Sequence, residues 1–335
     1  MRTPRLLAVA AAASLALLSA CGTVGSSSEP TRKQEAKPVT EVTIGFAQRQ
    51  MDAPYYAAME AMAQQRAKDE GFHLLFQNAG GDPVTQLNQV QAMLAQGVDA
   101  LVVNAISPET QRTQLEQAAG EVPVLFVDTS IPDIGLTAVQ SDNHEIGRLS
   151  GQITAKRIGS GKTIQVAILN GGPNDEIVGP ARQEGFLAGL TEGGVTPEVV
   201  ASATATYTQE EAIPATESML AAHPETDLVL GLNDSMALGA LSVLRNQGNG
   251  TVLVAAAADG QKEALAEIAN GGCTGQYVST GLNSPSLAAE QVFDIAVGVA
   301  TGQTDPASVQ KTSLTKAAGI GCENVSEYYD PTSVF

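Results

Sequence analysis

Apolar residues follow two alternating patterns along the chain after about residue 40. Short runs rich in Val, Ile, Leu and Phe, such as residues 42–47 and 100–104, predict buried strands. Between such runs, segments like residues 54–70 carry apolar side chains three or four positions apart, which predicts a helix that ends at Gly71. Strands this apolar, alternating with helices, predict a parallel sheet covered on both faces.

The same alternation starts again near residue 163. In the first half we expect strands at 42–47, 73–76, 100–104 and 122–128, with helices at 54–70 and 87–96. In the second half we expect strands at 163–169, 199–204, 227–232 and 252–258, with helices at 181–192, 210–222 and 235–247. A duplicated strand–helix unit predicts an α/β protein with two similar lobes.

Polar side chains recur where these strands end: Gln48, Asn104, Asp128, Asn233 and Asp259. In open α/β sheets, ligands bind at the carboxyl ends of the strands. Two facing lobes would therefore hold a small molecule between them.

The first residues have the pattern of an export signal. Arg2 and Arg5 precede an apolar stretch, and Leu18-Ser19-Ala20-Cys21 resembles the bacterial lipobox. We expect residues 1–20 to be a lipoprotein signal peptide, Cys21 to be the lipidated N-terminus, and residues 21–40 to be a flexible tether. The protein would then be anchored to the outer face of the cell membrane; the alternative is an ordinary signal with an incidental Cys.

Net charge and cysteine content further limit the class of protein to which this chain can belong. The net charge is −18 and no cluster of Lys and Arg occurs, which argues against nucleic-acid binding. Cys273 and Cys322 remain after export, and an even pair outside the cell favours a disulfide. The three His are scattered, so we expect no metal site and no cofactor.

The sequence gives little evidence of a catalytic motif. Residues 159–163 resemble the end of a phosphate loop, but Lys156 stands where the first Gly is required and a strand follows the motif. We interpret the segment as a turn and expect no enzyme activity. A minor alternative is an enzyme similar to a glycosidase, in which Asp128 and Asp259 would act as the acid/base pair.

Several segments together resemble the periplasmic sugar-binding proteins of ABC transporters, of the ribose- and galactose-binding type, which share their fold with the lac repressor family. Residues 44–48 and Pro54-Tyr55-Tyr56 resemble that family's first strand and the turn after it. Residues 81–100 and the run Asn233-Asp234-Ser235-Met236-Ala237-Leu238-Gly239-Ala240 are also similar to it. The resemblance covers about residues 41 to 330. A regulator of the lac repressor type is nearly excluded, because the lipobox stands where its DNA-binding helices would be.

The resemblance implies the type I periplasmic binding protein fold, with two Rossmann-like lobes joined by a three-segment hinge. The first lobe would comprise residues 41–142 and 280–313, and the second 143–279 and 314–335. The chain would cross near Asp142, Ser279 and Leu314, and a helix at 286–300 would return to the first lobe.

The resemblance also implies a set of ligand-binding residues. Tyr55, Tyr56 and Tyr207 would pack on a sugar ring, while Asp128, Arg182, Asn233 and Asp259 would bind its hydroxyl groups. We add Gln48 and Arg49, which follow the first strand. Alternatives stay open: Tyr56 could belong to the helix core, Arg49 to a solvated loop, and the four polar residues to helix caps or surface pairs.

Three departures from the ribose type put ribose itself in doubt. Ala53 stands where that type has a binding Asn, Thr129 where it has an Arg, and Ser279 at or near its hinge-side Gln.

The expected function is that of a monomeric lipoprotein receptor that captures a sugar or polyol and delivers it to an ABC transporter permease. Hinge closure would bury the ligand, and the closed form would dock on the permease. A sensor of the same fold, which passes a sugar, furanone or nucleoside signal to a membrane receptor, is the alternative.

Overall fold

The computed structural model describes residues 36–335 except 174 and 176. The predicted signal peptide (1–20), the lipidation site Cys21 and tether residues 22–35 lie outside the described residues.

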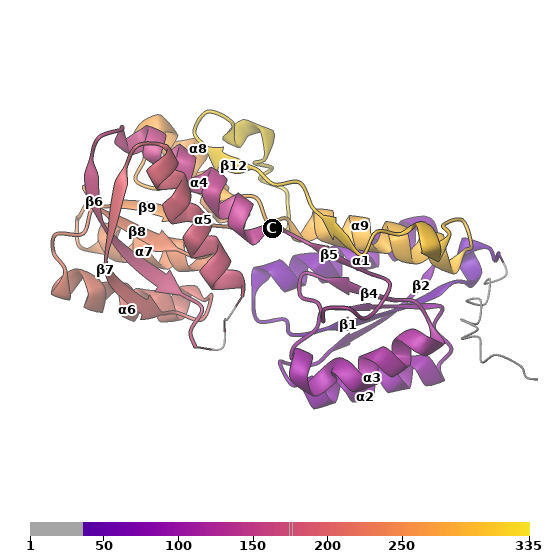
Figure 1. The fold of residues 1–335 in the computed structure, drawn as a ribbon. Helices are drawn as coiled ribbons and strands as arrows, with labels where there is room; N and C mark the ends of the chain where they lie inside the picture. The colour runs from indigo at the N-terminus through magenta and orange to yellow at the C-terminus, as the bar shows by residue number, and fades with distance from the viewer. Residues whose placement is uncertain (1–35, 174, 176) are drawn as a thin grey trace, which may run out of the picture. The chain divides into compact units, whose positions relative to one another are not determined.

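The first sheet contains six parallel strands in the order β11-β5-β4-β3-β1-β2 within the described part of the chain (Figure 1). The strands are β1 (Thr43–Gln48), β2 (His73–Asn78), β3 (Ala100–Val103), β4 (Val124–Val127), β5 (Thr137–Gln140) and β11 (Thr312–Leu314). The helices are α1 (Pro54–Glu70), α2 (Pro83–Ala95), α3 (Pro108–Glu121) and α9 (Pro285–Ala300). We call these elements the first lobe.

Successive side chains of each strand point to opposite faces of the sheet, so the first lobe has an apolar core on each face. Phe46 packs in a cluster with residues of α1 and α9, whereas its neighbour Ala47 packs with residues of α2 and α3. The expected parallel sheet with helices on both faces is confirmed.

The second sheet contains four parallel strands in the order β7-β6-β8-β9. They are β6 (Thr163–Asn170), β7 (Thr196–Thr204), β8 (Leu228–Gly231) and β9 (Leu253–Ala256). The helices are α4 (Asn143–Ile158), α5 (Val178–Glu192), α6 (Gln209–Ala222), α7 (Asp234–Asn246) and α8 (Lys262–Gly271). The antiparallel pair β10 (Ser279–Gly281) and β12 (Gly319–Gly321) continues this sheet through bridges such as Asp259 to Leu282. We call these elements the second lobe.

The chain passes three times between the lobes: at residues 141–142, 282–284 and 315–318. The second passage lies after β10, because β10 pairs with β12 of the second lobe. Residues 280–281, assigned above to the first lobe, therefore belong to the second. Leu314 pairs with Gln140 and belongs to the first, so the third passage also begins slightly later than expected.

A disulfide joins Cys273 to Cys322, with 5.1 Å between their Cα atoms. It ties the short helix η2 (Gly272–Thr274) to the segment directly after β12. The segment around Cys322 is thereby fixed to the second lobe, while the last residue, Phe335, packs against the core of the first lobe.

Two elements at the first passage were not predicted: β5 and α4. The buried face of α4 consists largely of small or hydroxylated residues, including Gly147, Ser150, Gly151 and Thr154, so it shows no apolar periodicity. Residues 159–162 form a turn between α4 and β6, as predicted, whereas Thr163, assigned above to that turn, begins β6.

Glycines bring the backbones of α4 and α5 into direct contact. A Cβ atom added at Gly147 would lie 2.5 Å from the carbonyl oxygen of Arg182, and one at Gly185 would lie 2.0 Å from that of His144. Gly151 and Gly189 are equally crowded. We call these four residues the glycine seam; it places Arg182 on α5 beside Asn143 at the start of α4.

We predict that Gly185→Ala lowers the free energy of unfolding by at least about 1–3 kcal/mol, because its methyl group would force the two helix backbones apart. Urea unfolding measures this change. Gly120→Ala in α3 is the matched control: its added Cβ meets open space, and it should raise stability by up to about 1 kcal/mol. Equal stability of the Gly185 variant and the wild type would contradict the role of the seam.

Candidate functional site

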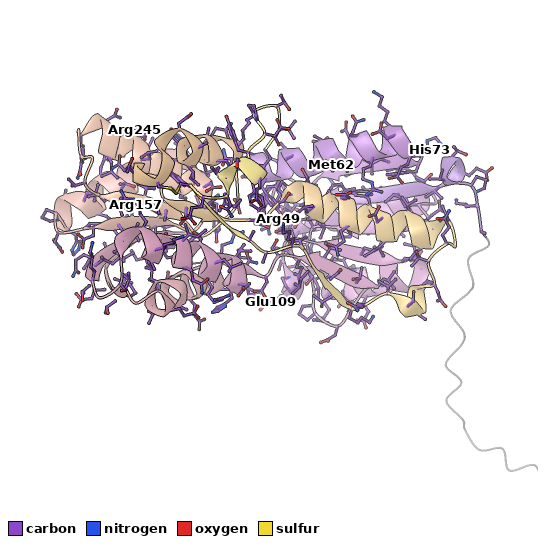
Figure 2. All side chains as sticks on the ribbon, turned by 90° about the horizontal axis from the view of Figure 1, so that it is seen from above. Arg49, Met62, His73, Glu109, Arg157 and Arg245 are labelled. Carbon is purple, nitrogen blue, oxygen red and sulfur yellow. A yellow bond between two sulfur atoms is a disulfide. The ribbon has the colours of Figure 1, made fainter. Side chains whose placement is uncertain are left out.

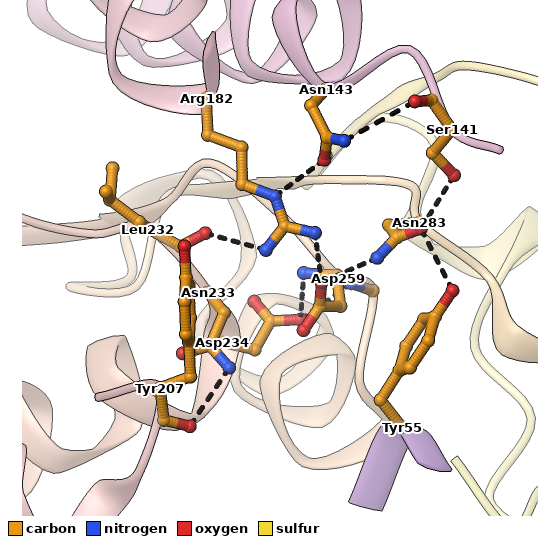
Figure 3. Close-up of polar contacts among 12 residues, drawn as sticks. Tyr55, Ser141, Asn143, Arg182, Tyr207, Leu232, Asn233, Asp234, Asp259 and Asn283 are labelled. Carbon is orange, nitrogen blue, oxygen red and sulfur yellow. Dashed lines mark hydrogen bonds and ion pairs between the residues drawn. The ribbon is translucent and has the colours of Figure 1, made fainter. Parts of the chain in front are cut away.

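A buried ion pair between Arg182 and Asp259 lies at the centre of the site (Figure 3). The Nη2 atom of Arg182 lies 3.1 Å from Oδ1 of Asp259, and the two residues are only 5% and 6% exposed. A charge this deeply buried is stable only when it is paired and hydrogen-bonded.

The remaining contacts of Arg182 fix the plane of its guanidinium. Nε donates to Oδ1 of Asn143 at 2.9 Å, and Nη1 donates to the carbonyl oxygen of Leu232 at 3.2 Å. Burial by itself lowers the pKa of Arg182, but Asp259, followed by Tyr207 and Asp128, raises it above its ordinary value. A guanidinium has five N–H groups, so these contacts leave donors for a ligand.

Asp259 is oriented from two sides. Nδ2 of Asn283 donates to its Oδ1 at 3.0 Å, the same oxygen that faces Arg182. Its own backbone N–H and those of Gly260 and Gln261 donate to Oδ2 of Asp234, at 3.1, 2.7 and 2.6 Å. Oδ2 of Asp259 accepts no hydrogen bond from the described residues, so one carboxylate oxygen is left for a ligand.

Asp234 positions Asp259 without being part of the predicted set. It is fully buried, and its Oδ1 accepts from the Tyr277 hydroxyl at 2.6 Å. Burial and then the charge of Asp259 raise its pKa. In the sequence, Asp234 stands out only because it follows Asn233 in the family-like run of residues 233–240. That position does not reveal that its side chain binds the backbone of residues 259–261.

Asp128 follows β4 in a strained turn. Its φ is 62°, and the N–H of Thr129 donates to the carbonyl oxygen of Val127 at 2.7 Å, as in a γ-turn. Burial raises the pKa of Asp128; the charges of Arg49 and Arg182 lower it and that of Asp259 raises it, and the net effect is upward. Asp128 of the first lobe is thus close enough to Arg182 of the second lobe for each side chain to change the pKa of the other. Left-handed conformation at a non-glycine residue is typical of functional sites.

The tyrosines of α1 pack edge to face, with 5.5 Å between the ring centroids of Tyr55 and Tyr56. Tyr55 is buried, contacts the ring of Phe335 and donates from its hydroxyl to Oδ1 of Asn283 at 3.4 Å. Tyr56 is half-buried and packs against the first lobe's core, which supports its place in the helix core, while its contact with a ligand stays a prediction. Burial and then Asp128 raise the pKa of both phenols, so both remain protonated donors at neutral pH.

Tyr207 and Asn233 hold each other in the second lobe. Tyr207 has φ 65°, donates from its hydroxyl to Asp175, and lies with its ring centroid 5.9 Å from Cζ of Arg182. Asn233 donates to the carbonyl oxygen of Tyr207 at 3.2 Å and accepts from the N–H of Met236 at 3.0 Å. Asn233 therefore caps α7, the role that the sequence reasoning placed second.

Gln48 and Arg49 shape the connection from β1 to α1. Gln48 is fully buried; its Oε1 accepts from the N–H of Arg49, and its Nε2 lies 3.5 Å from the carbonyl oxygen of Tyr56. Arg49, labelled in Figure 2, is partly buried, and its Nε has no hydrogen-bond partner among the described residues. Its charge lowers the pKa of both Asp128 and Tyr56, so the guanidinium lies near both groups, and its contact with a ligand stays a prediction.

Two of the three departures from the ribose type, Thr129 and Ser279, make hydrogen bonds within the protein. Ala53 precedes α1, and the hydroxyl oxygen of Thr129 lies 2.5 Å from Oδ1 of Asn104 and 2.6 Å from the carbonyl oxygen of Ala105, so its one proton is donated to one of the two. Ser279 is buried against Ser150 and Thr154 of α4. The polar residue that reaches the site from the second passage is Asn283, which sequence reasoning missed.

Comparison with known proteins gives a consistent result. The model of the periplasmic binding protein domain matches residues 44–304. The ribose import binding protein of Bacillus subtilis is 31% identical over 262 residues, which cover 76% of this chain and 81% of that protein. The xylitol-binding protein of Mycolicibacterium smegmatis is 27% identical over 333 residues, covering 96% of this chain and 89% of that protein.

Solved structures agree with these relatives. An ABC transporter solute-binding protein from Mycobacterium smegmatis with bound glycerol superposes with a TM-score of 0.77 at 28% identity. The match covers 88% of this chain and 98% of that one.

We predict that Asp128→Asn raises the free energy of unfolding of the unliganded protein at pH 7. A raised pKa means that the folded state binds the proton more tightly than the unfolded state, so stability falls as the pH rises above 3.8. The amide removes that charge, and Asn tolerates φ 62° as Asp does.

Urea titrations at pH 7 and pH 3.5 check this expectation. The variant should have a higher free energy of unfolding than the wild type at pH 7 and nearly the same value at pH 3.5. The control is Asp133→Asn, an exposed position with φ 65°, which should leave stability unchanged at both values. Lower stability of the Asp128 variant at pH 7 would contradict the expectation.

Proposed function

The chain belongs to the periplasmic binding protein domain family, and from that premise we propose that it captures a sugar or related polyol between its lobes and delivers it to an ABC importer. Proteins of this family bind substrates rather than transform them, and the proposal contains no catalytic step. The fold is that of a type I periplasmic binding protein.

The observation that carries the proposal is the buried Arg182–Asp259 pair with unused hydrogen-bonding capacity. Arg182 retains N–H donors after its three protein contacts, and Asp259 retains Oδ2 as an acceptor. A hydroxyl group both donates and accepts, so two neighbouring hydroxyls can satisfy the carboxylate and the guanidinium together. This pairing favours a polyhydroxy compound.

Residues from both lobes support a ligand held between them. Asp128 and Tyr55 come from the first lobe, and each is affected in its pKa by Arg182 of the second. The aromatic faces of Tyr55, Tyr56 and Tyr207 suit the C–H surface of a sugar ring. We propose that Gln48, Arg49 and Asn233 complete the site, Gln48 and Asn233 chiefly by shaping its loops.

Similar proteins point to the same ligand class. The relatives described above are named for ribose and for xylitol, and the similar structure contains glycerol. All three are small polyols. We propose that the altered residues beside the site, among them Arg49, select a polyol other than ribose.

We predict that a polyol raises the melting temperature of the mature protein. The panel comprises ribose, xylitol, glycerol, D-allose and myo-inositol, with a nucleoside and an amino acid as negative probes. A compound at a hundred times its dissociation constant adds about 2.7 kcal/mol to the free energy of unfolding. A shift only with the negative probes would contradict the ligand class.

Arg182→Lys tests the site itself. The lysine keeps the charge beside Asp259 but loses the fork of donors, so affinity for the stabilising polyol should fall about 10- to 100-fold by calorimetry. Arg245→Lys, at an exposed position, is the control and should bind as the wild type does. Unchanged affinity in the Arg182 variant would place the site elsewhere.

The family places the protein outside the cytoplasm, and we propose that a lipid on Cys21 anchors it to the membrane. None of the helices within residues 36–335 is long and apolar enough to cross a bilayer. The Cys273–Cys322 disulfide suits an oxidising compartment. We also propose that the receptor acts as a monomer.

We predict that Cys21→Ser releases the protein from the membrane fraction and prevents its labelling by a fatty-acid analogue, because the serine cannot form the thioether to the lipid. Cell fractionation and metabolic labelling measure both. Membrane association of the Cys21 variant equal to that of the wild type would contradict the proposed anchor.

A further inference from the structure

Asn283 contacts site residues of both lobes from the second passage. It is 2% exposed, and its Oδ1 accepts from the hydroxyls of Ser141 at 2.6 Å and Tyr55 at 3.4 Å. Its Nδ2 donates to Oδ1 of Asp259 at 3.0 Å, and its backbone N–H donates to the carbonyl oxygen of Asp259 at 2.7 Å. Figure 3 shows Asn283 between Tyr55 and Asp259.

The same contacts join all three passages at one point. Ser141 belongs to the first passage, Asn283 to the second and Thr315 to the third. The hydroxyls of Ser141 and Thr315 are 2.9 Å apart. Because Ser141 has one hydroxyl proton and donates it to Asn283, Thr315 must donate to Ser141. We call Ser141, Asn283 and Thr315 the passage junction.

We propose that Asn283 is a positioning residue: it orients the Tyr55 hydroxyl and the Asp259 carboxylate for the ligand and fixes both to the passage junction. The inference rests on the proposed function of the same site. A movement of one lobe relative to the other must pass through the three passages, so it also moves the groups that Asn283 holds. Ligand binding and lobe movement are thereby coupled through one side chain.

The chemistry of this position requires an amide. Asn283 must accept from two hydroxyls while it donates to a carboxylate, and an uncharged amide of this length does both. Capping of α9 does not explain the residue, because Ser284 provides that cap by accepting from the N–H of Leu287. Its side chain therefore serves contacts outside its own helix.

The test is Asn283→Asp, with affinity for xylitol and ribose measured by calorimetry at pH 7.5 and pH 5. At pH 7.5 two carboxylates face each other, and we expect affinity to fall at least about tenfold. At pH 5 a proton shared between them restores the donor that Asn283 supplies, so affinity should recover to within about threefold of the wild type at that pH. The charged or titratable groups around this point are Tyr55 and Tyr56 from α1, Arg182 from α5, Tyr207 after β7, Asp234 from α7, Tyr277 before β10, and Asp128 and Asp259 after β4 and β9.

The matched control is Asn324→Asp. Asn324 also donates and accepts through its side chain, but only to backbone groups of the second lobe, at Gly319 and Gly321. It should bind the polyol as the wild type does at both pH values. Unchanged affinity of the Asn283 variant at pH 7.5 would overturn the proposal, and so would a loss that persists at pH 5, since a purely structural defect gives no recovery.

A second measurement separates this inference from the proposed function. The proposed ligand class fails only if the wild type binds no polyol of the panel; if it binds neither xylitol nor ribose, hydrogen exchange of the unliganded protein still tests Asn283. At pH 7.5, Asn283→Asp should speed amide exchange in both peptides 53–60 and 257–262, and Asn324→Asp in neither. Unchanged exchange in either peptide of the Asn283 variant would overturn the proposal.

Discussion

The buried guanidinium of Arg182 must be compensated inside the protein, because removing a full charge from water costs far more than one ordinary hydrogen bond returns. Each neighbouring element contributes to that compensation. The start of α4 supplies Asn143, the end of β8 leads to the Leu232 carbonyl, and the segment after β9 supplies Asp259. The glycine seam allows α5 to approach α4 closely enough for the first of these contacts.

The compensation of Arg182 also explains why the site is ordered before a ligand arrives. Asp259 is held by Arg182, by Asn283 and, through its backbone, by Asp234. Side chains that already have protein partners lose little conformational entropy on binding, so more of the interaction energy appears as affinity. Their remaining donors and acceptors define which hydroxyl arrangement fits.

The sequence predicted the elements whose buried faces are apolar. Helix α1 has the predicted bounds because Pro54 begins it, Gly71 ends it, and large apolar side chains lie between them. Helix α4 escaped prediction because its buried face consists largely of glycine, alanine, serine and threonine. The resemblance to a known family pointed to Asp128, Arg182 and Asp259, whose charges affect one another in the structure, while their contact with a ligand stays a prediction. Asn143 and Asn283 carried no signal, because ordinary asparagines gain their roles only through contacts between distant segments.

The backbone at Asp128 restricts how this receptor can evolve. With φ 62°, the position accepts Asp, Asn or Gly readily and a β-branched or aromatic residue only at considerable strain. The carboxylate can therefore be exchanged for an amide or lost altogether, but not replaced by a new apolar surface. A lineage that acquires a ligand of different shape must therefore change neighbouring positions such as Arg49, whose backbone carries no such restriction. Position 128 itself would remain Asp, Asn or Gly.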